Sequence, residues 1–137
     1  MKALGIDHGD KRIGIAVSDD LGMLAHPLEF ILTEPYEAFL ERLKTIMVER
    51  QIEQIVVGMP RNMDGSYGPQ ALKVQNFLAT LKKSVAVPVQ SWDERLTSIS
   101  AVKNLREAGV NAKKAKAKVD ASAAAVMLQA YLDSLSG

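Results

Sequence analysis

Apolar residues in the first third of the chain alternate with small or polar residues, as they do in β-strands. Residues 2–9 (KALGIDHG) and 11–19 (KRIGIAVSD) are two such runs, and the turn-rich segment HGDK joins them. This pattern predicts a β-hairpin. Residues 25–33 (AHPLEFILT) predict a third strand. In residues 34–51 (EPYEAFLERLKTIMVERQ) the apolar spacing changes to that of an amphipathic helix behind a proline.

The rest of the chain alternates between predicted strands and predicted helices. Strand patterns occupy residues 52–60 (IEQIVVGMP) and 85–93 (VAVPVQSWD), and helix patterns occupy residues 68–83 (GPQALKVQNFLATLKK) and 96–109 (LTSISAVKNLREAG). A lysine-rich loop is predicted to follow, and residues 119–135 (VDASAAAVMLQAYLDSL) predict a last, buried helix because they are apolar on nearly every face. No repeat or low-complexity linker divides this order, so we expect a single domain over residues 1–137.

This order of elements predicts an α/β fold. Strands joined by a hairpin pair antiparallel, whereas strands separated by a helix pair in parallel beneath the helices that cover them. We therefore expect a mixed sheet flanked by helices. A site in such a fold is expected at the carboxyl ends of the parallel strands.

Composition narrows the chemistry that the fold can carry. The chain has 137 residues, of which 47% are apolar and 24% are charged, which is typical of one globular domain. It has no cysteine, so any site has to be built from oxygen and nitrogen groups. No signal peptide or membrane-spanning stretch stands out, and we expect a cytoplasmic protein with no membrane partner.

The charge pattern contains one basic segment. The net charge is +1, so attraction to nucleic acid has to come from a local patch. Residues 109–118 (GVNAKKAKAK) form such a patch without any acid, and its cations are Lys113, Lys114, Lys116 and Lys118. A solvated surface is the simpler interpretation, but the position directly before Asp120 favours phosphate binding.

Several carboxylates fall at the predicted ends of elements: Asp7, Asp93, Glu94 and Asp120. Like charges that share a partly buried site repel one another unless a cation neutralises them. Mg²⁺ prefers oxygen ligands, and a pair of such ions can stabilise both the attacking and the leaving oxygen of a phosphoryl displacement. If these acids converge, they predict metal-dependent hydrolysis of phosphodiester bonds.

Most of these acids also have a structural interpretation. Asp120 can be a favourable charge at the start of the last helix, and Asp93 can cap the helix that follows it. Glu94 and Arg95 can form a solvated pair. Asp7 has no local cap to serve, so the pattern favours a ligand there.

One loop and two histidines are further candidates. Residues 59–71 (MPRNMDGSYGPQA) join a strand to a helix through two glycines, and Arg61 and Asn62 are available there to a phosphate. An ordinary connecting loop is an equal alternative. We expect His8 and His26 to be structural or merely exposed.

Four stretches taken together form a specific signal. They are GIDHGDKRIGIAVSD, VVGMPRNMDGSYGPQA, WDERLTS and VDASAAAVMLQAYLD, in this order over essentially the whole chain. They resemble the YqgF family, whose members are named pre-16S rRNA nucleases or RuvX-type Holliday junction resolvases. The resemblance implies an RNase H-like nuclease domain, with a central five-stranded mixed β-sheet flanked by α-helices.

The resemblance also implies an active site. The acidic residues of the family fall on Asp7, Glu94 and Asp120, which would be both the catalytic residues and the ligands of two Mg²⁺ or Mn²⁺ ions. Related resolvases commonly carry a second acid on the last helix, where this chain has Ala123. Asp93 is a candidate to replace that missing acid.

The leading hypothesis is an endonuclease that acts on structured RNA, with maturation of the 16S rRNA 5′ end as the role that the resemblance implies. Branched DNA, as in a four-way junction, is the alternative substrate. Arg61, Arg95 and the lysine segment would contact the phosphate backbone. The protein would act as a monomer or a homodimer, and symmetric cleavage of a junction would require a two-fold dimer.

Two other classes of function also fit the sequence. The phosphate loop of actin-like sugar kinases and ATPases, DxGxxxxGxA, matches Asp7, Gly9, Gly14 and Ala16. Those enzymes need two lobes, and the length of this chain supplies one. A non-catalytic factor that binds nucleic acid and is linked to transcription is the other class.

Overall fold

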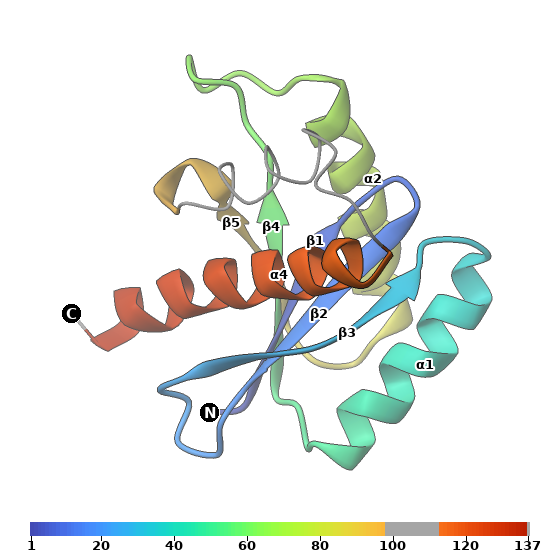
Figure 1. Cartoon of the computed structure of the whole chain (residues 1–137), viewed down its shortest axis with the longest axis vertical. Helices are drawn as coiled ribbons and strands as arrows, with labels where there is room; N and C mark the ends of the chain where they lie inside the picture. The colour runs from blue at the N-terminus through green and yellow to red at the C-terminus, as the bar shows by residue number, and fades with distance from the viewer. Residues whose placement is uncertain (98–112, 137) are drawn as a thin grey trace.

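The computed structural model describes residues 1–97 and 113–136, which form one central sheet with helices on both faces (Figure 1). The sheet has five strands in the order β3-β2-β1-β4-β5. The strands are β1 Ala3–His8, β2 Arg12–Ser18, β3 Ala25–Leu32, β4 Gln54–Met59 and β5 Val89–Asp93. The first three strands pair antiparallel, β4 pairs parallel with β1, and β5 pairs parallel with β4. The predicted mixed sheet is confirmed.

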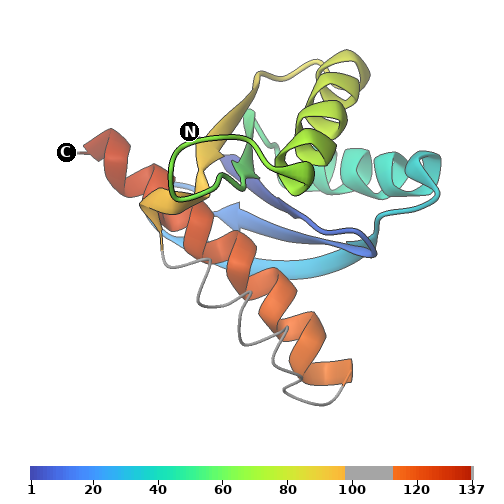
Figure 2. The same cartoon turned by 90° about the horizontal axis from the view of Figure 1, so that it is seen from above.

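Helices cover the sheet on both sides. The described α-helices are α1 Tyr36–Glu49, α2 Pro69–Ser84 and α4 Lys113–Ser136, and Glu94–Leu96 form the short 3-10 helix η1. Figure 2 shows α1 and α2 on one face and α4 crossing the other. Residues 98–109 of the predicted third helix lie outside the described residues. None of the described helices is both long enough and apolar enough to cross a membrane.

The last helix begins earlier than the sequence pattern predicts. It starts at Lys113, so the lysines Lys113, Lys114, Lys116 and Lys118 belong to its first turns and the prediction of a loop there was wrong. Alanine and lysine are strong helix formers, which explains why the helix extends through this segment. Asp120 therefore lies inside the helix and not in its first turn, so it does not serve as a helix-start charge.

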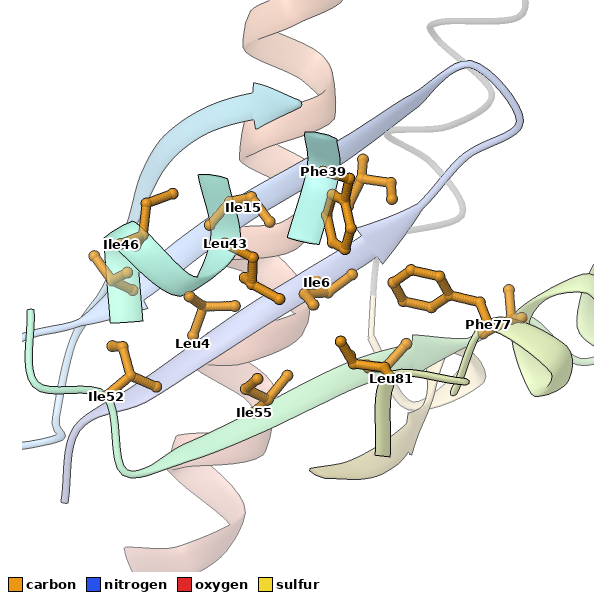
Figure 3. Close-up of a cluster of buried hydrophobic side chains, with 14 of the residues drawn as sticks. Leu4, Ile6, Ile15, Phe39, Leu43, Ile46, Ile52, Ile55, Phe77 and Leu81 are labelled. Atoms are coloured by element: carbon orange, nitrogen blue, oxygen red, sulfur yellow. The ribbon is translucent and has the colours of Figure 1, made fainter. Parts of the chain in front are cut away.

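The core beneath α1 and α2 is built from large aliphatic and aromatic side chains (Figure 3). Helix α1 contributes Phe39, Leu43 and Ile46, and α2 contributes Phe77 and Leu81. The strands send every second residue into this core, because successive strand residues point to opposite faces. These strand residues include Leu4, Ile6, Ile13, Ile15, Ile55 and Val57. Burial of such large side chains makes this face the main source of hydrophobic stabilisation.

The face beneath α4 is built from smaller residues. Its cluster contains Ala3, Ala16, Val56, Ala123, Ala124, Met127, Leu128, Tyr131 and Leu132. A Cβ atom added at Gly5 would lie 2.9 Å from Cβ of Leu128, so glycine is what lets α4 lie this close to β1. Residues 121–132 of the helix are all buried or half-buried, as the apolar pattern predicts.

Candidate active site

Asp7 lies near the carboxyl end of β1, on the face that α4 covers. The alternation of side chains along the strand assigns this face, because Ile6 points into the core beneath α1 and α2 while Gly5 faces Leu128 of α4. Asp7 is only 2% exposed. The carboxylate that the sequence singled out is therefore buried between the sheet and α4.

Glycines flank Asp7 on both neighbouring strands. Gly14 of β2 is its antiparallel partner. On β4, the parallel register that pairs Ile6 with Val57 makes Gly58 level with Asp7. Because glycine has no side chain, the sheet beside this carboxylate leaves room for other groups to approach the backbone.

Glu94 occupies part of that room. It is the first residue of η1, directly after β5, and it is 4% exposed. A Cβ atom at Gly58 would lie 2.8 Å from Oε1 of Glu94, so the carboxylate lies over this glycine. The structure thus brings Asp7 and Glu94 to neighbouring positions on one face, although they are far apart in the sequence. The alternative of a solvated Glu94–Arg95 pair is wrong, since Glu94 is buried.

Asp120 belongs to the helix that crosses the same face. It lies one turn before Ala124, whose carbonyl oxygen is 3.3 Å from the Cβ position at Gly5. The Asp120 side chain and those of the four predicted lysines lie outside the described part of the structure. Among the residues that are described, no three potential ligands form a group that could hold a metal ion. A metal site that includes Asp120 with Asp7 and Glu94 stays a prediction.

Asp93 is engaged with arginines rather than with the buried carboxylates. Its Oδ1 accepts a hydrogen bond from the backbone N–H of Arg95 at 2.9 Å, so it caps the short helix η1 and not the helix that was predicted over residues 96–109. Its Oδ2 accepts from Nη2 of Arg95 at 2.7 Å and from Nη1 of Arg61 at 3.4 Å. The side chain of Arg95 is the main cause that lowers the pKa of Asp93 from its ordinary value. Ala123 is fully buried, so that position is part of the packing beneath α4.

The loop of residues 60–68 is ordered by hydrogen bonds of its own. Arg61 donates to the carbonyl oxygen of Gly65 from Nε at 3.0 Å and also from Nη2. The guanidinium carbon of Arg61 lies 4.6 Å from the centre of the Tyr67 ring. The side-chain amide of Asn62 donates to a serine hydroxyl within the loop at 3.0 Å. Arg61 is therefore held in one orientation, and Asn62 contributes to the shape of the loop.

The two histidines lie away from the buried carboxylates. His8 is 8% exposed and its ring centre lies 4.5 Å from that of Phe77, in the core beneath α1 and α2. His26 is exposed on β3. Both positions agree with the expectation that these histidines are structural or merely exposed.

Arg12, the first residue of β2, was not among the predicted site residues. By the alternation along β2, it shares the face of Gly14 and hence of Asp7. Its guanidinium carbon lies 5.4 Å from the centre of the Phe30 ring, and its buried Nε has no hydrogen-bond partner in the described part of the chain. Because strand residues two positions apart share a face, the position of Arg12 two residues before Gly14 could have placed it on the face of Asp7.

Comparison with known proteins places the chain in a family. The family model described as "RuvX: Holliday junction resolvase" matches residues 1–134. The chain belongs to the RuvX family. A relative from Halothermothrix orenii is 47% identical over 133 residues, covering 97% of this chain and 95% of the relative. Another from Geobacillus kaustophilus is 46% identical over 136 residues, covering 98% and 99%. Both relatives carry the name "Putative pre-16S rRNA nuclease".

Solved structures similar to this RuvX chain include two resolvases. RuvC of Thermus thermophilus in complex with a Holliday junction substrate matches with a TM-score of 0.59 at 18% identity, covering 100% of this chain and 97% of RuvC. The resolvase of fowlpox virus with Holliday junction DNA matches with a TM-score of 0.52 at 10% identity, covering 98% and 99%. At these identities the likeness establishes the fold, and the predicted RNase H-like α/β fold is confirmed.

Proposed function

We propose that this RuvX protein is a metal-dependent endonuclease that hydrolyses phosphodiester bonds of structured nucleic acid. The observation that carries the proposal is the pair of buried carboxylates, Asp7 and Glu94, on a part of the sheet where glycine leaves room beside them. Two like charges on neighbouring positions favour a cation between them. Asp120, one turn before Ala124 on the helix that covers this face, would supply the third acid.

The residues present fit Mg²⁺ or Mn²⁺. Both ions take oxygen ligands, and the proposed donor set of Asp7, Glu94 and Asp120 consists of carboxylates alone. When bound, such ions polarise phosphate oxygens and neutralise the charge that develops in phosphoryl displacement. The packing of α4 on the small residues of the sheet would keep bulk water away from this chemistry.

Arginines and lysines would bind the backbone of the substrate. Arg61 and Arg95 lie beside the turn that carries Glu94, and their guanidinium groups suit phosphate oxygens. Asn62, in the same loop as Arg61, would also contact the phosphate backbone. The lysines of the first turns of α4 would extend the positive surface: Lys113, Lys114, Lys116 and Lys118.

We propose the precursor of 16S rRNA, cut near its mature 5′ end in the cytoplasm, as the substrate. The name that the curated relatives share supports this choice. A four-way DNA junction is the second candidate, favoured by the description of the family and by the fold shared with RuvC. A junction has to be cut on two symmetric strands, which requires a two-fold dimer, so the oligomeric state on each substrate separates the two candidates.

A cleavage assay tests the proposal. Wild type, Asp7→Asn and Asp10→Asn are incubated with a precursor 16S rRNA 5′ segment and with a synthetic four-way DNA junction, in Mg²⁺, Mn²⁺ or chelator. Asp10 is the matched control, because it is an exposed aspartate near Asp7 that pairs with Lys73 at 3.0 Å. We expect metal-dependent cleavage by wild type and Asp10→Asn, and a loss on the order of 10³-fold in Asp7→Asn.

Three results would contradict the proposal. Cleavage by Asp7→Asn at the wild-type rate would remove Asp7 from the site. Cleavage in chelator would remove the metal dependence. If neither substrate is cut while all three proteins bind equally, the protein is a non-catalytic factor that binds nucleic acid.

A further inference from the structure

Two arginines meet where the loop of residues 60–68 approaches η1. The Cβ position at Gly65 is 3.3 Å from Nη1 of Arg95 and 3.5 Å from Nη2 of Arg61. Gly65 has a φ of 89°, in the region that favours glycine, so a side chain here would be strained and would also enter the space beside the two guanidinium groups. Two positive groups this near to each other repel unless something holds them together.

Asp93 is the group that holds them. It accepts from Nε of Arg95 at 3.0 Å and from Nη2 at 2.7 Å, a fork that fixes the plane of this guanidinium. The same oxygen, Oδ2, is 3.4 Å from Nη1 of Arg61. The Asp93 side chain is 18% exposed, so water screens these contacts only in part. Gly65 and Tyr67 then fix Arg61 from its other sides.

This arrangement leaves donors for a ligand. A guanidinium has five N–H donors. Asp93 occupies Nε and Nη2 of Arg95, and within the described residues Nη1 of Arg95 donates no hydrogen bond. Nη1 of Arg61 makes only the long contact at 3.4 Å. The side chains of Arg61 and Arg95 are 27% and 33% exposed, so an incoming phosphate can reach the remaining donors.

We propose that Asp93 is a positioning residue that fixes Arg61 and Arg95 as a binding site for one backbone phosphate of the substrate, beside the bond that is cut. This inference rests on the proposed function. Asp93 and Glu94 are consecutive but point to different partners, Glu94 over Gly58 and Asp93 to the arginines. One short turn, capped by Asp93 itself, thus sets the separation between a buried active-site acid and the phosphate site.

Removal of the charge of Asp93 distinguishes two roles of this residue by their opposite effects on the affinity for nucleic acid. Asp93→Asn keeps the size of the side chain and an oxygen that can cap η1, but it loses the fork to Arg95. If Asp93 only diminished the positive charge of the site, this change would tighten binding of nucleic acid. If Asp93 positions the arginines, the same change weakens binding. Glu29→Gln is the matched control, because Glu29 forms a similar fork with Arg42 at 2.6 and 2.9 Å, away from the site.

Binding is measured in chelator, so that no cleavage occurs, over a series of salt concentrations. For Asp93→Asn we expect an affinity about tenfold lower, the effect of losing hydrogen bonds to a charged group. We also expect the slope of log K against log salt to become shallower by about 0.7 to 0.9, the value for one phosphate contact. Glu29→Gln keeps the wild-type affinity and slope. Unchanged or tighter binding by Asp93→Asn overturns the inference.

Kinetic constants and a second set of variants distinguish a positioning role from misfolding of Asp93→Asn. Under cleavage conditions, KM of Asp93→Asn rises about tenfold while kcat stays within about twofold, because the site binds substrate and transition state alike. Asp93→Glu keeps the carboxylate, so its KM should rise less than that of Asp93→Asn. In an Arg61→Gln/Arg95→Gln background, which should itself show the higher KM, Asp93→Asn has no further effect. A decrease in kcat alone contradicts a positioning role.

The two proposals fail in different ways. A wild-type protein that cuts neither substrate overturns the proposed function, while the salt series still tests whether Asp93 organises a phosphate site. A wild-type protein that cuts, together with an Asp93→Asn variant of normal affinity and KM, overturns only the role of Asp93.

Discussion

The two faces of the sheet are packed with residues of very different size. Beneath α1 and α2, leucine, isoleucine and phenylalanine interlock, and the Phe39 and Phe77 rings lie 5.6 Å apart. Beneath α4, glycine and alanine predominate on the strands, and Leu128 packs directly against the backbone at Gly5. The two buried carboxylates, Asp7 and Glu94, both lie on the α4 face.

The difference separates the source of stability from the place of chemistry. Large side chains remove much apolar surface from water and pack against one another on the first face. Small residues on the second face bury less apolar surface, but they let a helix and a carboxylate approach the backbone directly. Both faces share the strands β1 and β4, so the stability that the first face supplies holds together the sheet that carries Asp7 on the second. The following predictions test this division, from the largest effect to the smallest.

Phe39→Ala removes a ring from the centre of the first face. Phe39 is fully buried against α2, so we expect the free energy of unfolding to fall by about 3–5 kcal/mol. Urea denaturation measures this loss. Below the unfolding transition, the rate of cleavage per folded molecule should stay near that of wild type. A loss below about 1 kcal/mol would contradict the assignment of stability to this face.

Gly5→Ala adds a methyl group between β1 and α4. The new Cβ would lie 2.9 Å from Cβ of Leu128 and 3.3 Å from the carbonyl oxygen of Ala124, so the helix has to shift. We expect a loss of about 1–3 kcal/mol in the free energy of unfolding, with a parallel loss of cleavage. Because Leu128 is the obstacle, Gly5→Ala/Leu128→Ala should be less destabilised than the sum of the single variants. Strict additivity would contradict the close packing.

Gly58→Ala adds the same methyl group on the same face, but we expect it to affect cleavage more than stability. Here the new Cβ meets the end of a flexible side chain, Oε1 of Glu94 at 2.8 Å. Glu94 can move, so the free energy of unfolding should change by less than about 1 kcal/mol. The displaced carboxylate should lower cleavage by about 10²-fold, the effect of an ångström-scale misplacement at an active site. Unchanged cleavage with lowered stability would reverse the proposed roles of the two glycines.

Glu29→Gln tests the periphery of the first face by pH. The hydrogen bonds from Arg42 lower the pKa of Glu29, so the pair stabilises the folded protein above the ordinary glutamate pKa of about 4.3. This contribution is lost as the pH falls through the lowered pKa. We expect a slightly lower melting temperature for the variant at neutral pH, and no difference from wild type in strong acid. A difference that grows on acidification would contradict the sign.

Local patterns in the sequence determined most of the elements. The alternation of Ile13, Ile15 and Val17 predicts β2, and the spacing of Phe39, Leu43 and Ile46 in α1 predicts the face that packs on the sheet. Such periodicity reports burial over a few residues, and hairpin or crossover connections then limit how strands pair. The pattern around Asp7 already favoured a ligand there, and the resemblance to the family added the choice of Glu94 and Asp120 as its partners. The start of α4 was mispredicted, since lysine suits a loop and a helix surface alike.

Only the tertiary structure decided which of these residues meet. The parallel pairing of β1 with β4 and of β4 with β5 is what brings Glu94 over Gly58 and beside Asp7. The same pairing brings Asp93 to Arg61, a contact that no spacing in the sequence indicates, whereas the contact of Asp93 with Arg95 is local to one turn. Sequence patterns record whether a residue prefers burial or solvent, whereas a site depends on strand order and register, which arise only when the whole sheet forms.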